Sequence, residues 1–153
     1  MRHAGSMALC IDKITGSRER NPMGNCLKVG ILGAGNIAGS MAEALNELQK
    51  EGKACAYAVA SRSQEKALEF ARKWNITRAY SSYEELASDP EVDLIYIATP
   101  HSLHYEQAKL CMEHGKNVLV EKAFTANARQ AEELFAMAEE KKVFITEAIW
   151  TRY

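Results

Sequence analysis

Short apolar runs alternate with amphipathic segments along most of this chain, and this alternation constrains its fold more than any other feature. Runs of continuous apolar residues are typical of strands in a parallel sheet that is covered by helices on both faces. We therefore predict an α/β fold with a doubly wound, mainly parallel sheet of about six strands. The expected strands cover residues 27–32, 54–60, 78–80, 92–98, 117–120 and 143–146.

Helices are expected between these strands, because apolar residues there recur at intervals of three or four positions. Ser82 and Glu85 have the spacing of a capping box, and Asn127 with Gln130 has the spacing of a cap and its partner. Gly115 suits the left-handed position after a helix end. The predicted helices cover residues 37–48, 67–74, 82–86, 103–114 and 127–141.

The length and charge balance of the chain limit its classes of partner. Its 153 residues, 47% of them hydrophobic and 25% charged, suit one ordinary soluble domain. Lysine and arginine total 19 against 20 acidic residues, so no net charge favours nucleic acid or an anionic membrane. The sequence shows no apolar run of membrane-spanning length and no continuous apolar signal segment. We therefore expect a cytoplasmic protein without nucleic-acid or membrane partners.

The cysteines predict neither a disulfide framework nor a metal site. The four residues are widely spaced and include no C-x-x-C pair. We interpret them as reduced thiols, in keeping with a cytoplasmic location. They are Cys10, Cys26, Cys55 and Cys111.

A glycine-rich turn at residues 33–38, with the sequence GAGNIA, joins the first expected strand to the first expected helix. Gly33 permits a tight bend, Gly35 lets the backbone approach a pyrophosphate, and Ala38 stands where a third glycine usually packs helix against strand. The following helix N-terminus offers amides and a positive dipole end to an anion. The turn therefore predicts a dinucleotide site. Its expected contacts are Gly33, Gly35, Asn36, Ile37 and Ala38.

Polar residues follow the second expected strand, where an enzyme that prefers NAD usually has an acidic residue for the ribose 2′-hydroxyl. This chain has Ser61, Arg62 and Ser63 there. All three can donate hydrogen bonds to a 2′-phosphate, and a planar guanidinium can also stack on adenine. These residues predict a preference for NADP over NAD, the alternative being that Arg62 is a solvated loop charge.

Two further segments follow expected strands at the same carboxyl edge, where open α/β sheets bind their ligands. Residues 99–104 have the sequence TPHSLH, and contact with the cofactor is expected of His101 and His104 more than proton transfer. Glu121 and Lys122 follow the next strand. A lysine there can direct its ammonium at a substrate oxygen, and the carboxylate can orient it or shift its pKa. Taken alone, Glu-Lys is a common surface dipeptide.

The combination of these strings, in this order, resembles the N-terminal domain of the Gfo/Idh/MocA oxidoreductase family from about residue 27 to residue 153. The matching strings are Gly33-x-Gly35-x-x-Ala38, residues 99–104, and Glu121-Lys122-Ala123, which is similar to the family's Glu-Lys-Pro signature. The final residues 147–153, EAIWTRY, are more similar to the branch with dimeric dihydrodiol dehydrogenases and NADP-dependent sugar dehydrogenases.

The resemblance implies a Rossmann-type fold and an NAD(P)-dependent dehydrogenase that acts on CH-OH or CH-CH groups. Such an enzyme transfers a hydride between NADP(H) and a carbon of a sugar or diol substrate. The resemblance also implies that Lys122 is the catalytic residue of this domain and that Trp150 and Arg152 help to enclose the cofactor. The other contacts expected at the strand ends are Thr99, Pro100, His101, His104 and Glu121.

The chain departs from the family pattern in two ways. Ala123 stands where the family usually has proline. The family's C-terminal α/β domain, which shapes the substrate site and carries a histidine or tyrosine acid or base, is also expected to be missing. Any homo-oligomer would form through that domain, and the chain as given is expected to be almost inactive.

The resulting domain prediction has three parts: a flexible leader over residues 1–26, a nucleotide-binding domain over 27–147, and the start of a linker over 148–153. Two alternatives to the oxidoreductase remain. The chain could be a stand-alone module that senses NADP(H), or the inactive truncated product of a disrupted gene.

Overall fold

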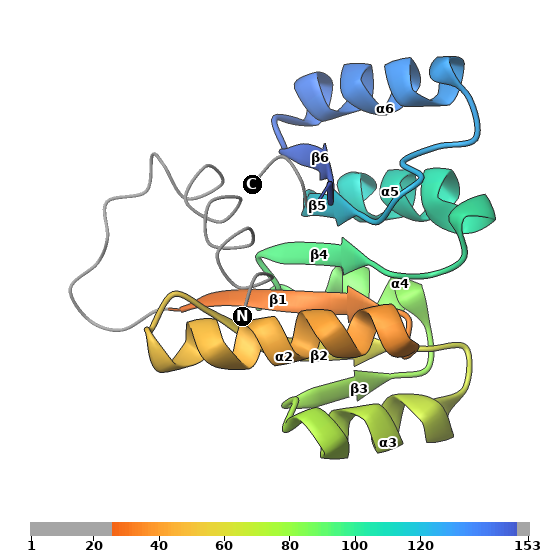
Figure 1. Cartoon of the computed structure of the whole chain (residues 1–153). Coiled ribbons are helices and arrows are strands. Elements are labelled where there is room, and N and C mark those ends of the chain that lie inside the picture. The colour runs from red at the N-terminus through yellow and green to blue at the C-terminus, as the bar shows by residue number, and fades with distance from the viewer. Residues whose placement is uncertain (1–25, 150–153) are drawn as a thin grey trace.

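A six-stranded sheet in the order β3-β2-β1-β4-β5-β6 organises the computed structural model, which describes residues 26–149 (Figure 1). Every neighbouring pair of strands is parallel. This strand order is that of the Rossmann fold, and the order reverses at β1 and β4. The α/β prediction is therefore confirmed. The strands are β1 (Leu27–Leu32), β2 (Ala54–Ala60), β3 (Arg78–Tyr80), β4 (Leu94–Ile97), β5 (Asn117–Val120) and β6 (Ile145–Glu147).

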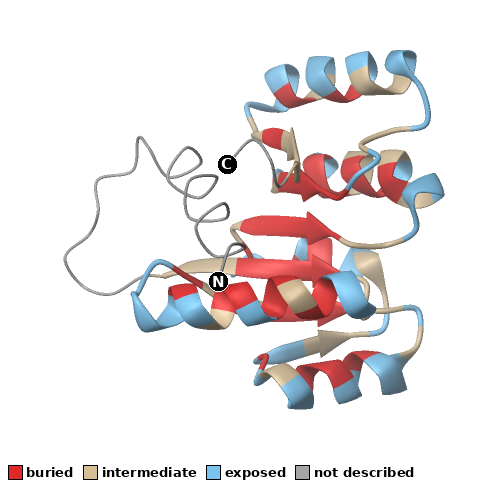
Figure 2. Cartoon of the chain, viewed as in Figure 1, coloured by how far each residue is buried: buried red, intermediate tan, exposed pale blue. Residues whose placement is uncertain are grey.

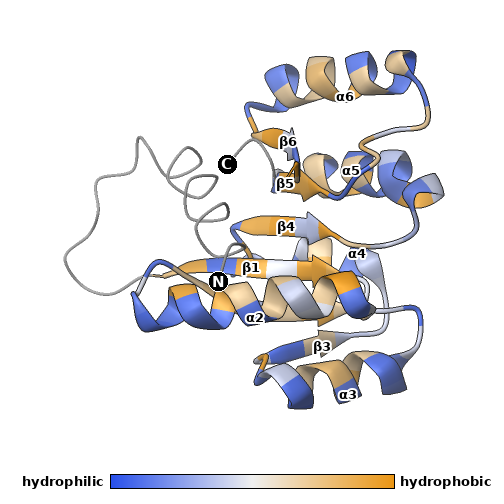
Figure 3. Ribbon diagram, in the orientation of Figure 1, coloured by the Kyte–Doolittle hydropathy of each residue, from blue (hydrophilic) through white to orange (hydrophobic). Residues whose placement is uncertain are grey.

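Helices cover both faces of this sheet and enclose an apolar core on each (Figure 2). Successive strand residues point to opposite faces, so Ile31 and Tyr96 lie in the core under α2 and α3, whereas Leu32 and Ile97 lie in the other. The central strands are consequently hydrophobic over most of their length (Figure 3). Within residues 26–149 the helices are α2 (Asn36–Lys50), α3 (Gln64–Trp74), α4 (Tyr83–Ser88), α5 (His104–Glu113) and α6 (Ala128–Lys141), with a 3-10 turn η1 (His101–Leu103).

The helix ends form as the capping patterns predict. The Glu85 amide donates to Ser82 Oγ at 3.1 Å, and the Gln130 amide donates to Asn127 Oδ1 at 3.0 Å. Gly115 has a φ of 71°, in the left-handed region. These local signals act over a few residues, which is why the sequence reveals them.

Two strand boundaries differ from prediction because turns occupy the predicted starts. The Val92 amide donates to the Asp89 carbonyl at 3.2 Å, and β4 begins at Leu94. The Val143 amide donates to the Ala138 carbonyl at 3.0 Å in the C-terminal cap of α6, and β6 begins at Ile145. Both segments are apolar because they pack against the core, and apolar character alone does not distinguish a turn from a strand.

The described cysteines are free thiols. Burial raises the pKa of Cys111 to about 12, and burial followed by a hydrogen bond with Cys26 raises the pKa of Cys55 to about 12. Because the thiolate is the reactive form, neither Cys55 nor Cys111 suits nucleophilic chemistry.

Predictions for both ends of the chain lie outside the described residues. They concern Cys10 and nearly all of the leader, and residues 150–153 of the linker start. No helix within residues 26–149 is long and apolar enough to cross a membrane.

Candidate nucleotide-binding and catalytic site

The carboxyl ends of the strands meet at one edge of the sheet because the strands are parallel. Gly33 follows β1 and Thr99 follows the neighbouring β4. A Cβ atom added to Gly33 would lie 2.8 Å from the Ala98 carbonyl oxygen, so these two turns are in contact. Ser61 follows β2 on one side, and Glu121 follows β5 on the other. The fold therefore brings the predicted segments to one edge.

The glycine turn has the backbone geometry that its sequence predicts. Gly33 has a φ of +104° and donates its amide to the Ala60 carbonyl at 2.9 Å. Gly35 is the extended N-cap residue of α2, and a Cβ atom there would meet no described atom within 4 Å. Ala38 is fully buried where α2 packs on the sheet. Gly33 is thus required by the protein's own packing, whereas Gly35 borders open space.

The N-terminus of α2 has no side-chain cap among the described residues, whereas Ser63, Ser82 and Asn127 cap α3, α4 and α6. The first-turn amides of a helix have no acceptor within the helix, and the dipole places partial positive charge there. Asn36 and Ile37 in this turn are exposed. Open space at Gly35 and uncapped amides together fit a dinucleotide pyrophosphate.

A hollow of about 490 Å³ opens beside the glycine turn, between α2 and α3. Its lining includes Gly35, Asn36, Lys66 and Trp74. The Trp74 ring packs against Gly39, where an added Cβ atom would lie 3.4 Å from the ring. Trp74 therefore forms part of the wall of the hollow. Sequence reasoning missed Lys66, although its place in the first turn of the helix after Arg62 is a usable signal.

The β2–α3 loop is held in shape by its own hydroxyl groups. Ser61 Oγ accepts from the Ser63 amide at 3.3 Å, and Ser63 Oγ accepts from the Lys66 amide at 3.4 Å. A serine oxygen that accepts a hydrogen bond still has its O–H to donate. Arg62 between them is exposed. The loop therefore offers two hydroxyl donors and a cation to an anionic ligand.

The segment after β4 is bound to α5. Thr99 Oγ1 hydrogen-bonds with Gln107 Oε1, and Gln107 is buried. His101 and Pro100 are exposed, so they are accessible to a ligand. His104 is 1% exposed, and both of its ring nitrogens contact backbone carbonyls, those of Thr99 and Ala123. Within this segment Pro100 and His101 are therefore accessible to a ligand, whereas the imidazole of His104 is enclosed.

Glu121 is buried and holds the backbone of its neighbour. Its Oε1 accepts from the Tyr96 hydroxyl, and its Oε2 accepts from the Lys122 backbone amide at 3.1 Å. Burial, followed by the hydrogen bond to the Glu121 carboxylate, raises the pKa of Tyr96, so the hydroxyl keeps its proton. The Lys122 side chain is exposed. The carboxylate thus orients the lysine through its main chain.

The loop after Lys122 has several further attachments. The Lys122–Ala123 peptide bond is cis. The Phe124 amide donates to Glu147 Oε1 at 2.8 Å, and the Phe124 ring stacks on Phe135 with centroids 5.4 Å apart. Strand β6 and helix α6 therefore both hold the loop that carries the exposed ammonium.

The sequence predicts the support of the exposed lysine from Glu121 but not that from Tyr96 and Glu147, because the positions of the latter two depend on strand register. Tyr96 pairs with Leu119, so Glu121, two residues further along, lies on the same face of the sheet as Tyr96. Glu147 pairs with Val120 at the end of β6. No spacing within a single segment of sequence reports these contacts.

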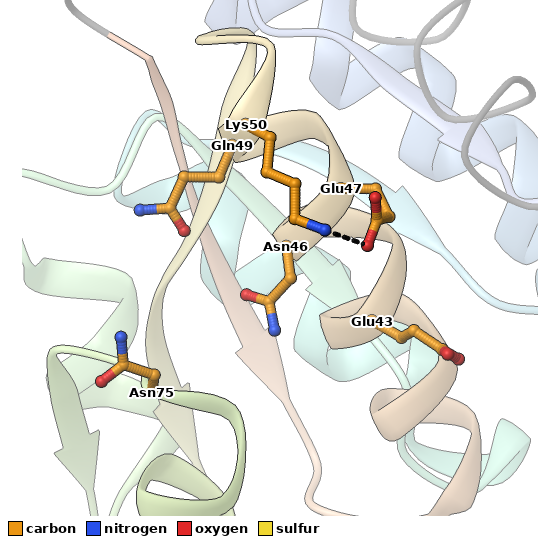
Figure 4. A pocket seen from close by; sticks show the side chains of 6 residues that line it. All are labelled: Glu43, Asn46, Glu47, Gln49, Lys50 and Asn75. Carbon is orange, nitrogen blue, oxygen red and sulfur yellow. Dashed lines mark hydrogen bonds and ion pairs between the residues drawn. The ribbon is translucent and has the colours of Figure 1, made fainter.

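A second hollow, of about 520 Å³, lies at the other end of α2 and has a polar lining (Figure 4). Its charged groups are partly paired with each other, since Lys50 Nζ donates to Glu47 Oε1 at 2.7 Å. It lies away from the carboxyl edge, because α2 runs from the glycine turn to Lys50. We assign it no role in the site.

The predicted contacts Trp150 and Arg152 lie outside the described residues. The other predicted residues lie on the turns at the carboxyl edge or in the first turns of the helices that follow them. The individual contacts stay predictions.

Comparison with known proteins decides the family. The Gfo/Idh/MocA family, an oxidoreductase family with an NAD-binding Rossmann fold, matches residues 27–148. The chain belongs to the Gfo/Idh/MocA oxidoreductase family. The described residues therefore form an NAD(P)-binding Rossmann domain, and the family contains NAD(P)-dependent dehydrogenases that act on CH-OH groups.

Named relatives of this Gfo/Idh/MocA domain include two kinds of dehydrogenase. The trans-1,2-dihydrobenzene-1,2-diol dehydrogenase of Mus musculus is 45% identical over 127 residues, which is 83% of this chain and 38% of that protein. The D-xylose 1-dehydrogenase (NADP(+)) of Hypocrea jecorina is 41% identical over 136 residues, 83% of this chain and 35% of that protein.

A solved structure shows the same domain as part of a larger chain. KijD10, a 3-ketoreductase from Actinomadura kijaniata in complex with NADP and TDP-benzene, superposes with a TM-score of 0.73 at 33% identity. The match covers 81% of this chain and 37% of that chain. This chain thus spans little more than a third of the length of these relatives.

Proposed function

We propose that this chain is the nucleotide-binding domain, over residues 27–147, of an oxidoreductase that prefers NADP(H) and transfers a hydride between the nicotinamide and a carbon of a sugar or diol. The observation that carries the proposal is the uncapped N-terminus of α2 behind Gly35, next to a β2–α3 loop with serine and arginine donors. Relatives that use NADP and relatives named for a diol and a sugar support it.

Each turn at the sheet edge has a proposed part in binding. Gly33, Gly35, Asn36, Ile37 and Ala38 would hold the pyrophosphate through the first turn of α2. Ser61, Arg62 and Ser63, together with Lys66 in the adjoining hollow, would bind the 2′-phosphate. Thr99, Pro100 and His101 would form the wall next to the glycine turn, with His104 and Glu121 supporting them from within.

Lys122 is the proposed catalytic residue of this domain. The nicotinamide, when bound, supplies the hydride acceptor or donor. The Lys122 ammonium is exposed at the carboxyl edge, and its backbone is held by the buried Glu121 carboxylate at 3.1 Å. From there it would donate a hydrogen bond to the substrate oxygen and stabilise negative charge as the oxygen loses its proton.

The rest of the substrate site is proposed to come from residues that this chain does not contain, because the matches cover only 38% and 35% of the two relatives. Positioning of a substrate supplies about 7 to 11 kcal/mol of a catalysed barrier. We therefore propose that the 153-residue chain binds the cofactor and turns over sugars or diols only weakly. Oligomer formation is assigned to the same additional residues.

Replacing Arg62 with alanine is expected to weaken NADP+ binding by about tenfold, because one charge-assisted hydrogen bond to the 2′-phosphate is lost. NAD+ has no such phosphate, so its dissociation constant should stay within about twofold. Calorimetric titration of the chain with each nucleotide measures both values.

Arg72→Ala is the matched control, because Arg72 is an exposed arginine in the last turn of α3. It should leave both affinities unchanged. Equal or tighter binding of NAD+ by the wild-type chain would show that the NADP preference is wrong. An unchanged preference in Arg62→Ala would remove Arg62 from the phosphate site.

A further inference from the structure

His104 lies between two turns of the candidate site that are far apart in sequence. Its side chain is 1% exposed at the junction of η1 and α5. Nε2 lies 2.9 Å from the Thr99 carbonyl oxygen, and Nδ1 lies 2.8 Å from the Ala123 carbonyl oxygen. One imidazole therefore connects the end of β4 to the loop after β5.

The peptide group between Ala123 and Phe124 is held at both of its ends. His104 Nδ1 contacts its carbonyl oxygen at 2.8 Å, and its amide donates to Glu147 Oε1 at 2.8 Å. This peptide follows Lys122 by one residue. The Lys122 amide is itself held by Glu121. The direction of the Lys122 side chain consequently depends on contacts of the backbone on either side of it.

Both nitrogens of His104 face acceptors, which limits how the ring can bond. A neutral imidazole has one N–H to donate and one lone pair. A neutral ring can therefore donate to only one of the two carbonyls, and a protonated ring can donate to both. A change at one carbonyl alters the bond to the other. An apolar side chain of similar size would fill the same space without this connection.

We propose that His104 is a positioning residue that couples the Thr99 turn to Lys122. A nucleotide that binds against the Thr99 turn changes the Nε2 contact, and the Nδ1 contact passes this change to the peptide after Lys122. The proposal rests on the proposed function, in which the Thr99 turn borders the cofactor and Lys122 acts on the substrate.

The test follows the Lys122 and Phe124 backbone amides by NMR while the chain is titrated with NADP+. In the wild-type chain these amide signals should shift as NADP+ binds. In His104→Leu the shifts, compared at saturating NADP+ so that any change in affinity does not enter, should fall by at least about fivefold. His114→Leu is the matched control, because His114 caps the other end of α5 and contacts Glu84 instead.

Two further variants separate the two contacts. The amide nitrogen of an asparagine side chain can occupy the position of Nδ1, and that of a glutamine side chain the position of Nε2. Hydrogen exchange of the Phe124 amide should be about tenfold faster in His104→Leu and in His104→Gln, and near wild type in His104→Asn. Neither His104→Asn nor His104→Gln should restore the NADP+-induced shifts. Amides of β1 should exchange equally in all variants, which excludes a loss of global stability.

The outcomes distinguish this proposal from the proposed function. Shifts that persist in His104→Leu, or NADP+ binding by the wild-type chain without shifts at Lys122 and Phe124, would overturn the coupling. Absence of NADP+ binding to the wild-type chain would instead count against the proposed function. In that case hydrogen exchange of the Phe124 amide would still test whether His104 positions the loop. Equal exchange rates in wild type and His104→Leu would overturn the positioning role.

Discussion

Replacing Gly35 with aspartate is expected to weaken NADP+ binding by about 100-fold without lowering the stability of the fold. Gly35 is the extended N-cap residue of α2, and an added Cβ atom there would meet no described atom within 4 Å. Aspartate is a favoured N-cap residue, and its charge suits the positive end of the helix. Its carboxylate would occupy the amides proposed for the pyrophosphate and would repel that anion.

Gly33→Ala should have a different result. Gly33 has a φ of +104°, and a Cβ atom would lie 2.8 Å from the Ala98 carbonyl oxygen. The strain of such a conformation costs about 1 to 3 kcal/mol, which lowers Tm by roughly 5 to 10 °C for a domain of this size. The two glycines of one motif thus separate into one that the fold requires and one that the ligand requires.

Thermal unfolding and calorimetric titration of both variants measure these effects. Gly52→Asp adds the same charge after the other end of α2, where a Cβ atom also meets open space, and should keep NADP+ affinity within about twofold of wild type. The φ of +69° at Gly52 should nevertheless lower the Tm of this control. A Gly35→Asp variant that binds NADP+ normally would show that the pyrophosphate does not lie on α2.

Replacing Lys122 with methionine is expected to lower kcat by about 1,000-fold, because methionine keeps the length of the side chain and removes the donor proposed for the substrate oxygen. The measurement needs a complete substrate site. A chimera in which residues 27–148 replace the matching part of the Mus musculus trans-1,2-dihydrobenzene-1,2-diol dehydrogenase provides one, since the two sequences are 45% identical there. NADPH formation from trans-diols and aldoses is the readout.

Lys109→Met is the matched control for this chimera. Lys109 lies on α5, with its ammonium over the Tyr105 ring at 5.3 Å, and should have little effect on kcat. Turnover by Lys122→Met equal to that of the unmodified chimera would exclude the catalytic role. Robust turnover by the 153-residue chain alone would contradict the proposal that it lacks most of the substrate site.

The candidate site was predictable where its signal is contained in one short segment. The glycine turn is such a segment, because the bend, the helix start and the missing cap all involve residues 33–38. The caps of α4 and α6, formed by Ser82 and Asn127, are others. The boundaries of β4 and β6 were less predictable, because a turn beside an apolar core has the same composition as a strand.

The role of Glu121 shows the limit of such signals. Its sequence position next to Lys122 predicts a carboxylate that orients the lysine or shifts its pKa, without saying through which atoms. In the structure the carboxylate bonds Tyr96 and the Lys122 backbone. The contact with Tyr96 depends on the register of β4 against β5, which places Tyr96 on the same face of the sheet.

The α/β class, the parallel sheet and the glycine turn follow from residue type and spacing along the chain, so they are predictable before the fold is known. Which residues support one another across the site depends on tertiary packing. Thr99 with His104, Ala123, and Glu147 come from three separate segments and meet through parallel pairing and the packing of α5 against the sheet. Contacts of this kind are set by strand register and layer packing, which no local pattern records.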